Sequence, residues 1–306
     1  PGIWDLIPEL FYWSRILSAT FGVATVFLVY LSAKMLFDRS TGLLAALFLS
    51  ITVGFNGLAH FATVDIPAVF WMMLAFLMTL RVLERDELRR YVIAGFAVGL
   101  CSSTKYTGVL MIVPLLLVFV VNQAKCSSAG FIKYIWTPKL LTIFVAAFGG
   151  FVVGTPYSIL AFRHFVGEFI MLNFYQSTYG GLSESLAFWP HLENLLNIQG
   201  IFLFSLSMIG LVYVAVTGWR KRSVGILVLL VSIGTIYLKM GSMHFFPPRY
   251  IMPLVPLLAI CAGKLAVDIL SGAFLGSFMG LVRYAFIISG VAFTFIYAAT
   301  GIFDIY

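Results

Sequence analysis

The sequence predicts an all-α fold, a polytopic bundle of transmembrane helices that takes up the whole chain, residues 1–306, as a single domain. Hydrophobic residues make up 61% of the chain and charged residues only 10%, whereas ordinary soluble domains carry about 25% charge. Polar material is therefore too scarce to cover a soluble globule of this size. The apolar runs are also long and lack the two-residue alternation of a membrane β-barrel.

Ten apolar stretches reach or approach the roughly 20 residues that a helix needs to cross a bilayer. The fourth and fifth are short, and the alternative for this pair is one helical hairpin that crosses only partly. Pro67 falls in the first turn of the third, where its missing N–H is harmless, and Pro253 and Pro256 should bend the ninth. In chain order the stretches cover residues 16–37, 41–59, 66–82, 91–104, 107–122, 140–158, 199–218, 224–241, 249–266 and 283–300.

Lys and Arg residues predict the orientation. With the N-terminus outside, fourteen of the 19 Lys and Arg residues fall at cytoplasmic helix ends and five at outer ends, as the positive-inside rule requires. The net charge of +7 thus indicates topology and contact with membrane lipids, and we expect no nucleic-acid partner.

The longest outer loop is predicted at residues 159–198. Aromatic and aliphatic residues mix with charged ones between positions 162 and 174. This mixture is typical of an amphipathic helix that lies in the membrane interface. Residues 188–190, Phe-Trp-Pro, should then lead the chain back into the membrane.

Isolated charged residues at the outer helix ends are the candidates for chemistry, because such groups are costly at that depth. The run HFATVDIP covers residues 60–67 and links the second and third stretches. Asp65 lies near the start of a helix, where its carboxylate could simply cap backbone N–H groups. Its alternative role is to position a nucleophile or bind a divalent cation, with His60 or His244 as a second ligand, although the spacing matches no metal motif.

Two cations are predicted on the same membrane face. Lys105 lies in the run SSTKYTG at 102–108, and it either reaches lipid phosphate or neutralises a specific phosphate, with the neighbouring hydroxyls as further donors. Arg249 lies in the run HFFPPRY at 244–250. It either anchors the helix at the interface or grips a phosphate or carboxylate through two parallel hydrogen bonds.

Together these groups suit a substrate whose phosphate sits at headgroup level, such as a lipid-linked phosphate sugar. An acceptor hydroxyl would attack the sugar carbon with a carboxylate as general base, while cations or a metal stabilise the departing phosphate. We therefore assign catalysis and tentative metal binding to Asp65. The residues assigned to donor phosphate or substrate binding are Lys105, Tyr106, Arg249, Tyr250, His60 and His244.

Runs of the sequence occur in the order of a known family's landmarks. They lie at residues 15–22, 34–39, 65–67, 95–108, 154–157 and 249–256. In this order they resemble the integral-membrane glycosyltransferases of the protein O-mannosyltransferase and aminoarabinose-transferase group, which have a C-type glycosyltransferase fold. The resemblance covers most of the chain.

The resemblance implies a membrane glycosyltransferase that takes a sugar from a polyprenyl-phosphate donor, inverts its anomeric carbon and gives it to a hydroxyl of a protein or glycolipid acceptor. It implies an extracytoplasmic or lumenal site with Asp65 near the catalytic centre and Lys105 and Arg249 near the donor phosphate. It also implies a multi-pass protein of a prokaryotic plasma membrane, or of the endoplasmic reticulum in a eukaryote.

The sequence departs from the family at the main acidic motif of the first outer loop, because Asp5 and Glu9 stand too close to Arg15 to supply it. We expect a chain that is truncated at both ends, with this loop upstream. The alternative function is a transporter or flippase of a lipid-linked or anionic solute, although charges at mid-membrane and an internal repeat, which transporters often show, are missing here. A non-catalytic membrane scaffold is the third reading.

Overall fold

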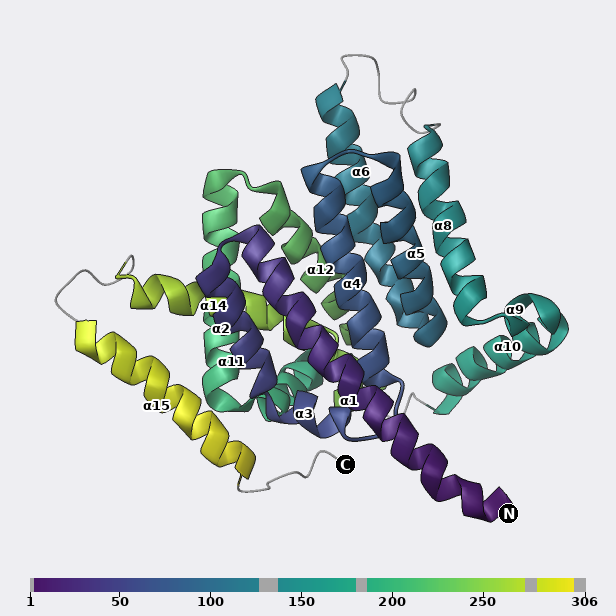
Figure 1. Ribbon diagram of the computed structural model, residues 1–306, viewed down its shortest axis with the longest axis horizontal. Helices are drawn as coiled ribbons and strands as arrows, with labels where there is room; N and C mark the ends of the chain where they lie inside the picture. The colour runs from purple at the N-terminus through teal and green to yellow at the C-terminus, as the bar shows by residue number, and fades with distance from the viewer. Residues whose placement is uncertain (1–2, 127–136, 180–185, 273–279, 300–306) are drawn as a thin grey trace.

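The computed structural model describes residues 3–126, 137–179, 186–272 and 280–299, and these ranges contain helices and no strand (Figure 1). The predicted all-α bundle is therefore confirmed. In chain order the elements are α1 (Ile3–Leu36), α2 (Arg39–Ser50), α3 (Val53–Ala59), α4 (Asp65–Glu84), α5 (Leu88–Thr104), the 3₁₀ helix η1 (Tyr106–Met111), α6 (Ile112–Cys126), α8 (Pro138–Gly154), α9 (Tyr157–Leu160), α10 (Phe162–Tyr179), α11 (Phe188–Lys221), α12 (Val224–Gly241), α13 (Pro248–Ile251), α14 (Leu254–Leu270) and α15 (Gly280–Ala299).

Each predicted stretch falls on a helix or on two consecutive helices, but the count of ten spans is not confirmed. Among the described residues, five helices are long and apolar enough to cross a membrane: α1, α4, η1 with α6, α11 and α12. A sixth span results if α2 and α3, which meet at a bend of 65°, are one broken span. The helices α5, α8 and α14 have 17 residues each, which is short of the roughly 20 that a bilayer needs.

Two boundaries differ from the prediction for local reasons. The ninth stretch is split, because α13 ends at Ile251 and α14 starts after Pro253. Residues 188–198, predicted as the end of the long loop, instead form the first turns of α11. Gly200 has a φ of 71° there and bends α11 between these turns and the rest of the helix.

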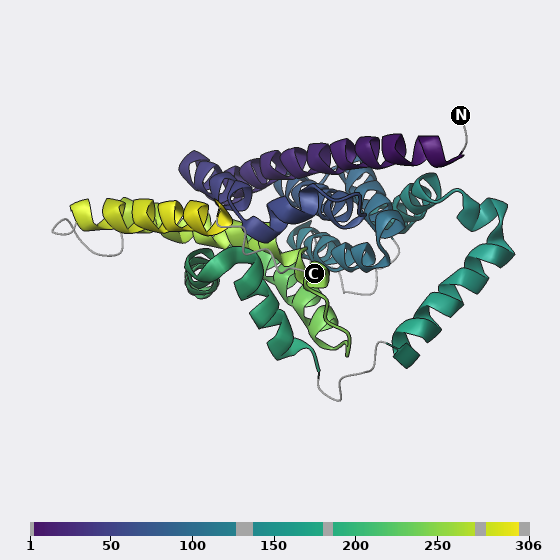
Figure 2. The same ribbon diagram turned by 90° about the horizontal axis from the view of Figure 1, so that it is seen from below.

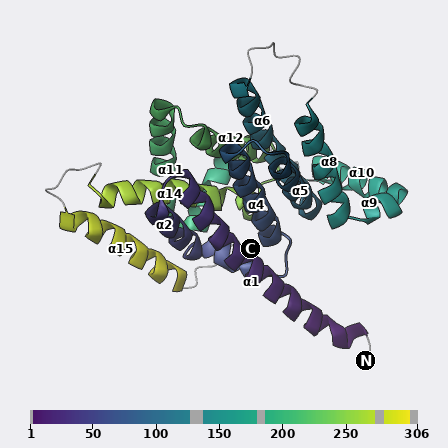
Figure 3. The same ribbon diagram turned by 45° about the horizontal axis from the view of Figure 1, so that its top comes forward.

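α14 occupies the centre of the bundle. Thirteen of its 17 residues are buried, as expected for a helix that is apolar on all sides. Its two charged residues pair with each other, since the Lys264 ammonium lies 2.7 Å from the Asp268 carboxylate. The Tyr213 hydroxyl of α11 donates to the same carboxylate at 2.6 Å. α2 and α11 pack against α14, and α15 lies at the periphery, where it contacts α11 and α14 (Figures 1 and 3).

α5 and α8 approach each other through glycines that face one another. A Cβ atom at Gly95 would stand 2.7 Å from the Ile143 carbonyl oxygen, and one at Gly150 would overlap the Phe96 carbonyl oxygen. Small residues allow this close backbone approach, which stabilises helix pairs in membranes. α9 and α10 follow α8 and project from one side of the bundle (Figure 2).

We predict that Gly150→Val destabilises the α5–α8 pair, because the new side chain must displace backbone atoms of α5. Overpacking of this kind costs about 1–3 kcal/mol. The neighbouring change Gly149→Val is the matched control, since a Cβ at Gly149 meets no atom within 4 Å. Thermal unfolding of the detergent-solubilised protein measures both variants, and equal shifts in the two would contradict the packing described here.

Candidate functional site

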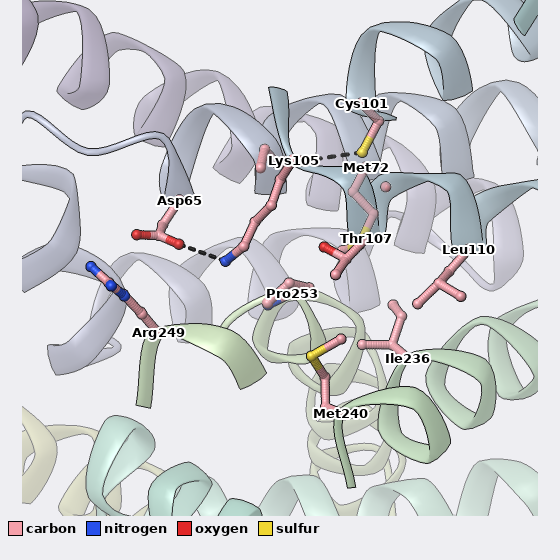
Figure 4. A pocket seen from close by; sticks show the side chains of 12 residues that line it. Asp65, Met72, Cys101, Lys105, Thr107, Leu110, Ile236, Met240, Arg249 and Pro253 are labelled. Carbon is pink, nitrogen blue, oxygen red and sulfur yellow. Dashed lines mark hydrogen bonds and ion pairs between the residues drawn. The ribbon is translucent and has the colours of Figure 1, made fainter. Parts of the chain in front are cut away.

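A small pocket lies at the end of the bundle where α4 begins and α5 and α12 end (Figure 4). It has room for about 20 Å³, enough for about one water molecule. The pocket is therefore nearly filled by its own side chains in this conformation. Its lining residues are Asp65, Ala68, Met72, Cys101, Lys105, Thr107, Gly108, Leu110, Ile236, Met240, Arg249 and Pro253.

An ion pair between Asp65 and Lys105 forms the polar centre of the pocket. The Lys105 ammonium donates to the Asp65 carboxylate at 2.8 Å, and Asp65 is only 5% exposed. In the described part of the chain this is the one hydrogen bond that the carboxylate receives. Asp65 therefore neutralises Lys105 across two helices and does not act as a simple helix cap.

The turn after α5 directs Lys105 into the pocket. Lys105 has an extended backbone (φ −150°, ψ 125°), and its carbonyl accepts from the Gly108 N–H at 2.8 Å. Gly108 passes so close to Cys101 that a Cβ atom there would lie 2.5 Å from the Cys101 sulfur. A glycine is therefore needed for the chain to fold back over the end of α5.

Arg249 and Tyr250 bring the second cation and an aromatic ring to the site. Both belong to α13, which starts at Pro248 and ends before the break at Pro253. The Lys105 ammonium lies 4.6 Å from the centre of the Tyr250 ring, a favourable cation–π contact. The Arg249 guanidinium lies on the other side of Asp65 from Lys105 (Figure 4) and forms no ion pair with any described residue. Two cations and one carboxylate leave the site with a net positive charge.

The first turns of α11 hold the loop that precedes Arg249. The Ala187 N–H donates to the carbonyls of Gly241 and Met243 at 2.9 and 3.1 Å, and the Asn194 amide donates to the Phe246 carbonyl at 2.8 Å. Sequence reasoning did not single out Asn194. An uncharged polar residue inside an apolar helix that follows Trp-Pro was the signal that could have identified it.

Other predicted site residues do not line the pocket. His60 and His244 are exposed, and a ring nitrogen of His60 lies 2.7 Å from the Asn56 carbonyl. Tyr106 instead packs edge-on against Phe169 of α10, with ring centres 5.1 Å apart. Of the neighbouring hydroxyls, Thr107 lines the pocket. Three others instead donate to carbonyls of α5: Ser102, Ser103 and Thr104.

The described residues around Asp65 do not fit a metal ion. Across the described ranges, no group of three or more His, Cys, Asp and Glu side chains is arranged to hold one. Asp65, the tentative ligand, is already paired with Lys105. We therefore derive no step that involves a metal.

Comparison with known proteins supports the predicted resemblance. The family model described as dolichyl-phosphate-mannose-protein mannosyltransferase matches residues 11–149. No curated protein sequence matches the chain. The apolar helices and the family match support an integral membrane protein, and its fold is that of the C-type membrane glycosyltransferases.

Solved structures share the fold at low sequence identity. The archaeal oligosaccharyltransferase AglB from Archaeoglobus fulgidus, in complex with an inhibitory peptide and a dolichol-phosphate, aligns with a TM-score of 0.61 at 15% identity. ArnT from Cupriavidus metallidurans bound to undecaprenyl phosphate aligns with 0.58 at 18%. Both alignments cover 94% of this chain, but 44% of the AglB chain and 58% of the ArnT chain. A crystal structure of the Archaeoglobus fulgidus oligosaccharyltransferase is a complex with Zn and sulfate.

We predict that Asp65 and Lys105 are energetically coupled. Asp65→Asn and Lys105→Met each leave one partner of a largely buried pair unpaired, whereas the double variant removes both charges. The coupling energy should be about 1–3 kcal/mol in unfolding experiments. The control cycle combines Asp65→Asn with Arg249→Gln, for which we expect weaker coupling, because Arg249 makes no ion pair with Asp65. Additive effects of Asp65→Asn and Lys105→Met would rule out the pair.

Proposed function

We propose that this chain contains the donor site of a glycosyltransferase that moves a sugar from a polyprenyl phosphate to a hydroxyl group of a protein or glycolipid. The observation that carries the proposal is the pocket in which Lys105 and Arg249 flank the buried carboxylate of Asp65. The net positive charge of this cluster complements a phosphate, and a guanidinium can hold two phosphate oxygens at once.

Arg249 is the first contact that we propose for the donor phosphate. Arg249 is exposed at the edge of the pocket and forms no ion pair with a described residue, so it can bind without breaking an existing pair. Lys105 has further N–H groups besides the one that bonds to Asp65, and these can reach a phosphate oxygen once the narrow pocket widens. AglB and ArnT have been solved with dolichol-phosphate and undecaprenyl phosphate, respectively, which supports a lipid phosphate as the ligand class.

In the proposed reaction, the acceptor oxygen forms a bond to the anomeric carbon as the bond from that carbon to the phosphate oxygen breaks. The configuration inverts, and the lipid phosphate leaves with the bonding electron pair. Lys105 and Arg249 stabilise the negative charge that develops on this phosphate. Asp65 takes the proton of the acceptor hydroxyl, and Lys105 fixes the direction of its carboxylate.

The charged groups of the site gather at one end of the bundle, which favours an enzyme with a one-sided site over a transporter or flippase. We place this end at the extracytoplasmic face, in a prokaryotic plasma membrane or the endoplasmic reticulum. In this arrangement residues 159–198 form an outer segment of the single membrane domain, and α10 lies in the interface.

We predict that Arg249→Gln lowers the affinity for undecaprenyl phosphate about tenfold or more, because a charge-assisted pair of hydrogen bonds is lost. Arg163→Gln is the matched control, since Arg163 is an exposed arginine of α10 outside the pocket. Lipid titration of the purified protein measures both. Equal affinities of the two variants would contradict the proposed phosphate contact.

We predict that Asp65→Asn slows sugar transfer about 10²–10⁴-fold, the usual contribution of a general base, while undecaprenyl phosphate affinity changes less than tenfold. Transfer is measured with the protein that contains this chain and a polyprenyl-phosphate sugar. A loss of lipid affinity as large as the loss of transfer would instead show that Asp65 acts only by positioning Lys105. Unchanged transfer would remove Asp65 from the reaction.

A further inference from the structure

A groove lies where α11 turns into α12, at the opposite end of α12 from the candidate site. It has a volume of about 490 Å³, much larger than the candidate pocket. Its lining is mostly apolar and includes Ala215, Val224, Leu227 and Leu230, with Arg222 as its charged member. In Figure 1 the α11–α12 turn lies at the same end of the bundle as the α4–α5 turn.

The groove forms because α11 ends in a tight turn. Arg222 adopts a left-handed backbone (φ 49°, ψ 41°), and the Ser223 N–H donates to the Gly218 carbonyl at 3.1 Å. α12 then returns close to α11, because Gly218 has no side chain and leaves room for Ile226. A Cβ atom added at Gly218 would lie 2.9 Å from the Cβ of Ile226. The tight turn leaves Arg222 exposed beside the apolar lining of the groove.

Three cations follow one another at this turn without an ion pair among the described residues. Arg220, Lys221 and Arg222 follow one another, and none of them forms an ion pair within the part of the chain that the structure describes. The sequence contains no Asp or Glu between Glu193 and Asp268. An anion at this turn would therefore meet three consecutive cations that form no ion pair with a described residue.

An apolar stripe on α11 leads from the bundle surface to the groove. Its residues recur at spacings of three and four, so they share one helix face. They are Ile209, Val212, Val216 and Trp219, and their exposed fractions are 59%, 64%, 45% and 86%. In a membrane helix this exposed face contacts lipid chains, and a tryptophan at its end is typical of the interface with the headgroups.

We propose that the groove formed by the α11–α12 turn binds an anionic phospholipid. The headgroup phosphate pairs with Arg222 and its neighbours Lys221 and Arg220, Trp219 lies at the headgroup boundary, and an acyl chain follows the apolar stripe of α11. A soluble anion would contact only the cations, whereas a lipid also contacts the adjacent apolar groove. The combination therefore favours a lipid as the ligand. This site is independent of the proposed transferase site.

Native mass spectrometry of the purified chain tests the proposal, with titration of phosphatidylglycerol and phosphatidylcholine of the same acyl chains. We expect phosphatidylglycerol to bind at least tenfold more tightly than phosphatidylcholine, and the variant R220Q/K221Q/R222Q to remove this preference. The control R81Q/R85Q/R89Q removes three cations at the α4–α5 turn, at the same end of the bundle, and should keep it. These residues are all exposed, and thermal unfolding confirms that each variant remains folded.

Three results would overturn the site: equal affinity of the native chain for both lipids, retention of the preference in R220Q/K221Q/R222Q, or an equal loss in the control. Titration with glycerol 3-phosphate, which has no acyl chain, distinguishes binding of the headgroup from binding of the acyl chain. Binding of this soluble anion as tight as that of the lipid would show a plain anion site. Trp219→Ala should weaken both lipids, and an unchanged affinity would remove the apolar stripe from the account.

Discussion

The ion pair between Asp65 and Lys105 is the interaction on which the candidate site depends. It joins the first turn of α4 to the turn that ends α5, across a pocket with room for about one water. A buried charge without a partner is costly, so each side chain fixes the other. Because Lys105 also faces the Tyr250 ring, the pair connects α4 and α5 to α13 and thereby to Arg249.

The site is assembled by backbone features that lie outside it. Gly108 allows the chain to fold back over Cys101, Pro253 separates α13 from the buried helix α14, and Asn194 ties the start of α11 to the Phe246 carbonyl. α14 supplies the rigid centre against which these elements pack. The two ends of α12 then differ in character: one reaches a compact charged pocket, the other an open groove beside three consecutive cations.

Composition and apolar run length were sufficient to predict the helical class and the approximate helix positions, because burial of apolar surface determines both. Isolated charges at helix ends indicated Asp65, Lys105 and Arg249, which the structure brings together. The predicted site also included His60, His244 and Tyr106, which do not line the pocket, since one sequence cannot show which way a side chain points. The number of spans and the start of α11 depended on tertiary packing, where a glycine bend at Gly200 and helices of 17 residues are tolerated.

In the proposed site, a lipid phosphate binds between Lys105 and Arg249. The most direct measurement is a cryo-electron-microscopy structure of the protein saturated with undecaprenyl phosphate. We expect phosphate density within hydrogen-bond distance of the Arg249 guanidinium and the Lys105 ammonium, in a pocket larger than the about 20 Å³ of the unliganded protein. An unaltered Asp65–Lys105 pocket, with the phosphate bound elsewhere in the protein, would contradict this proposal.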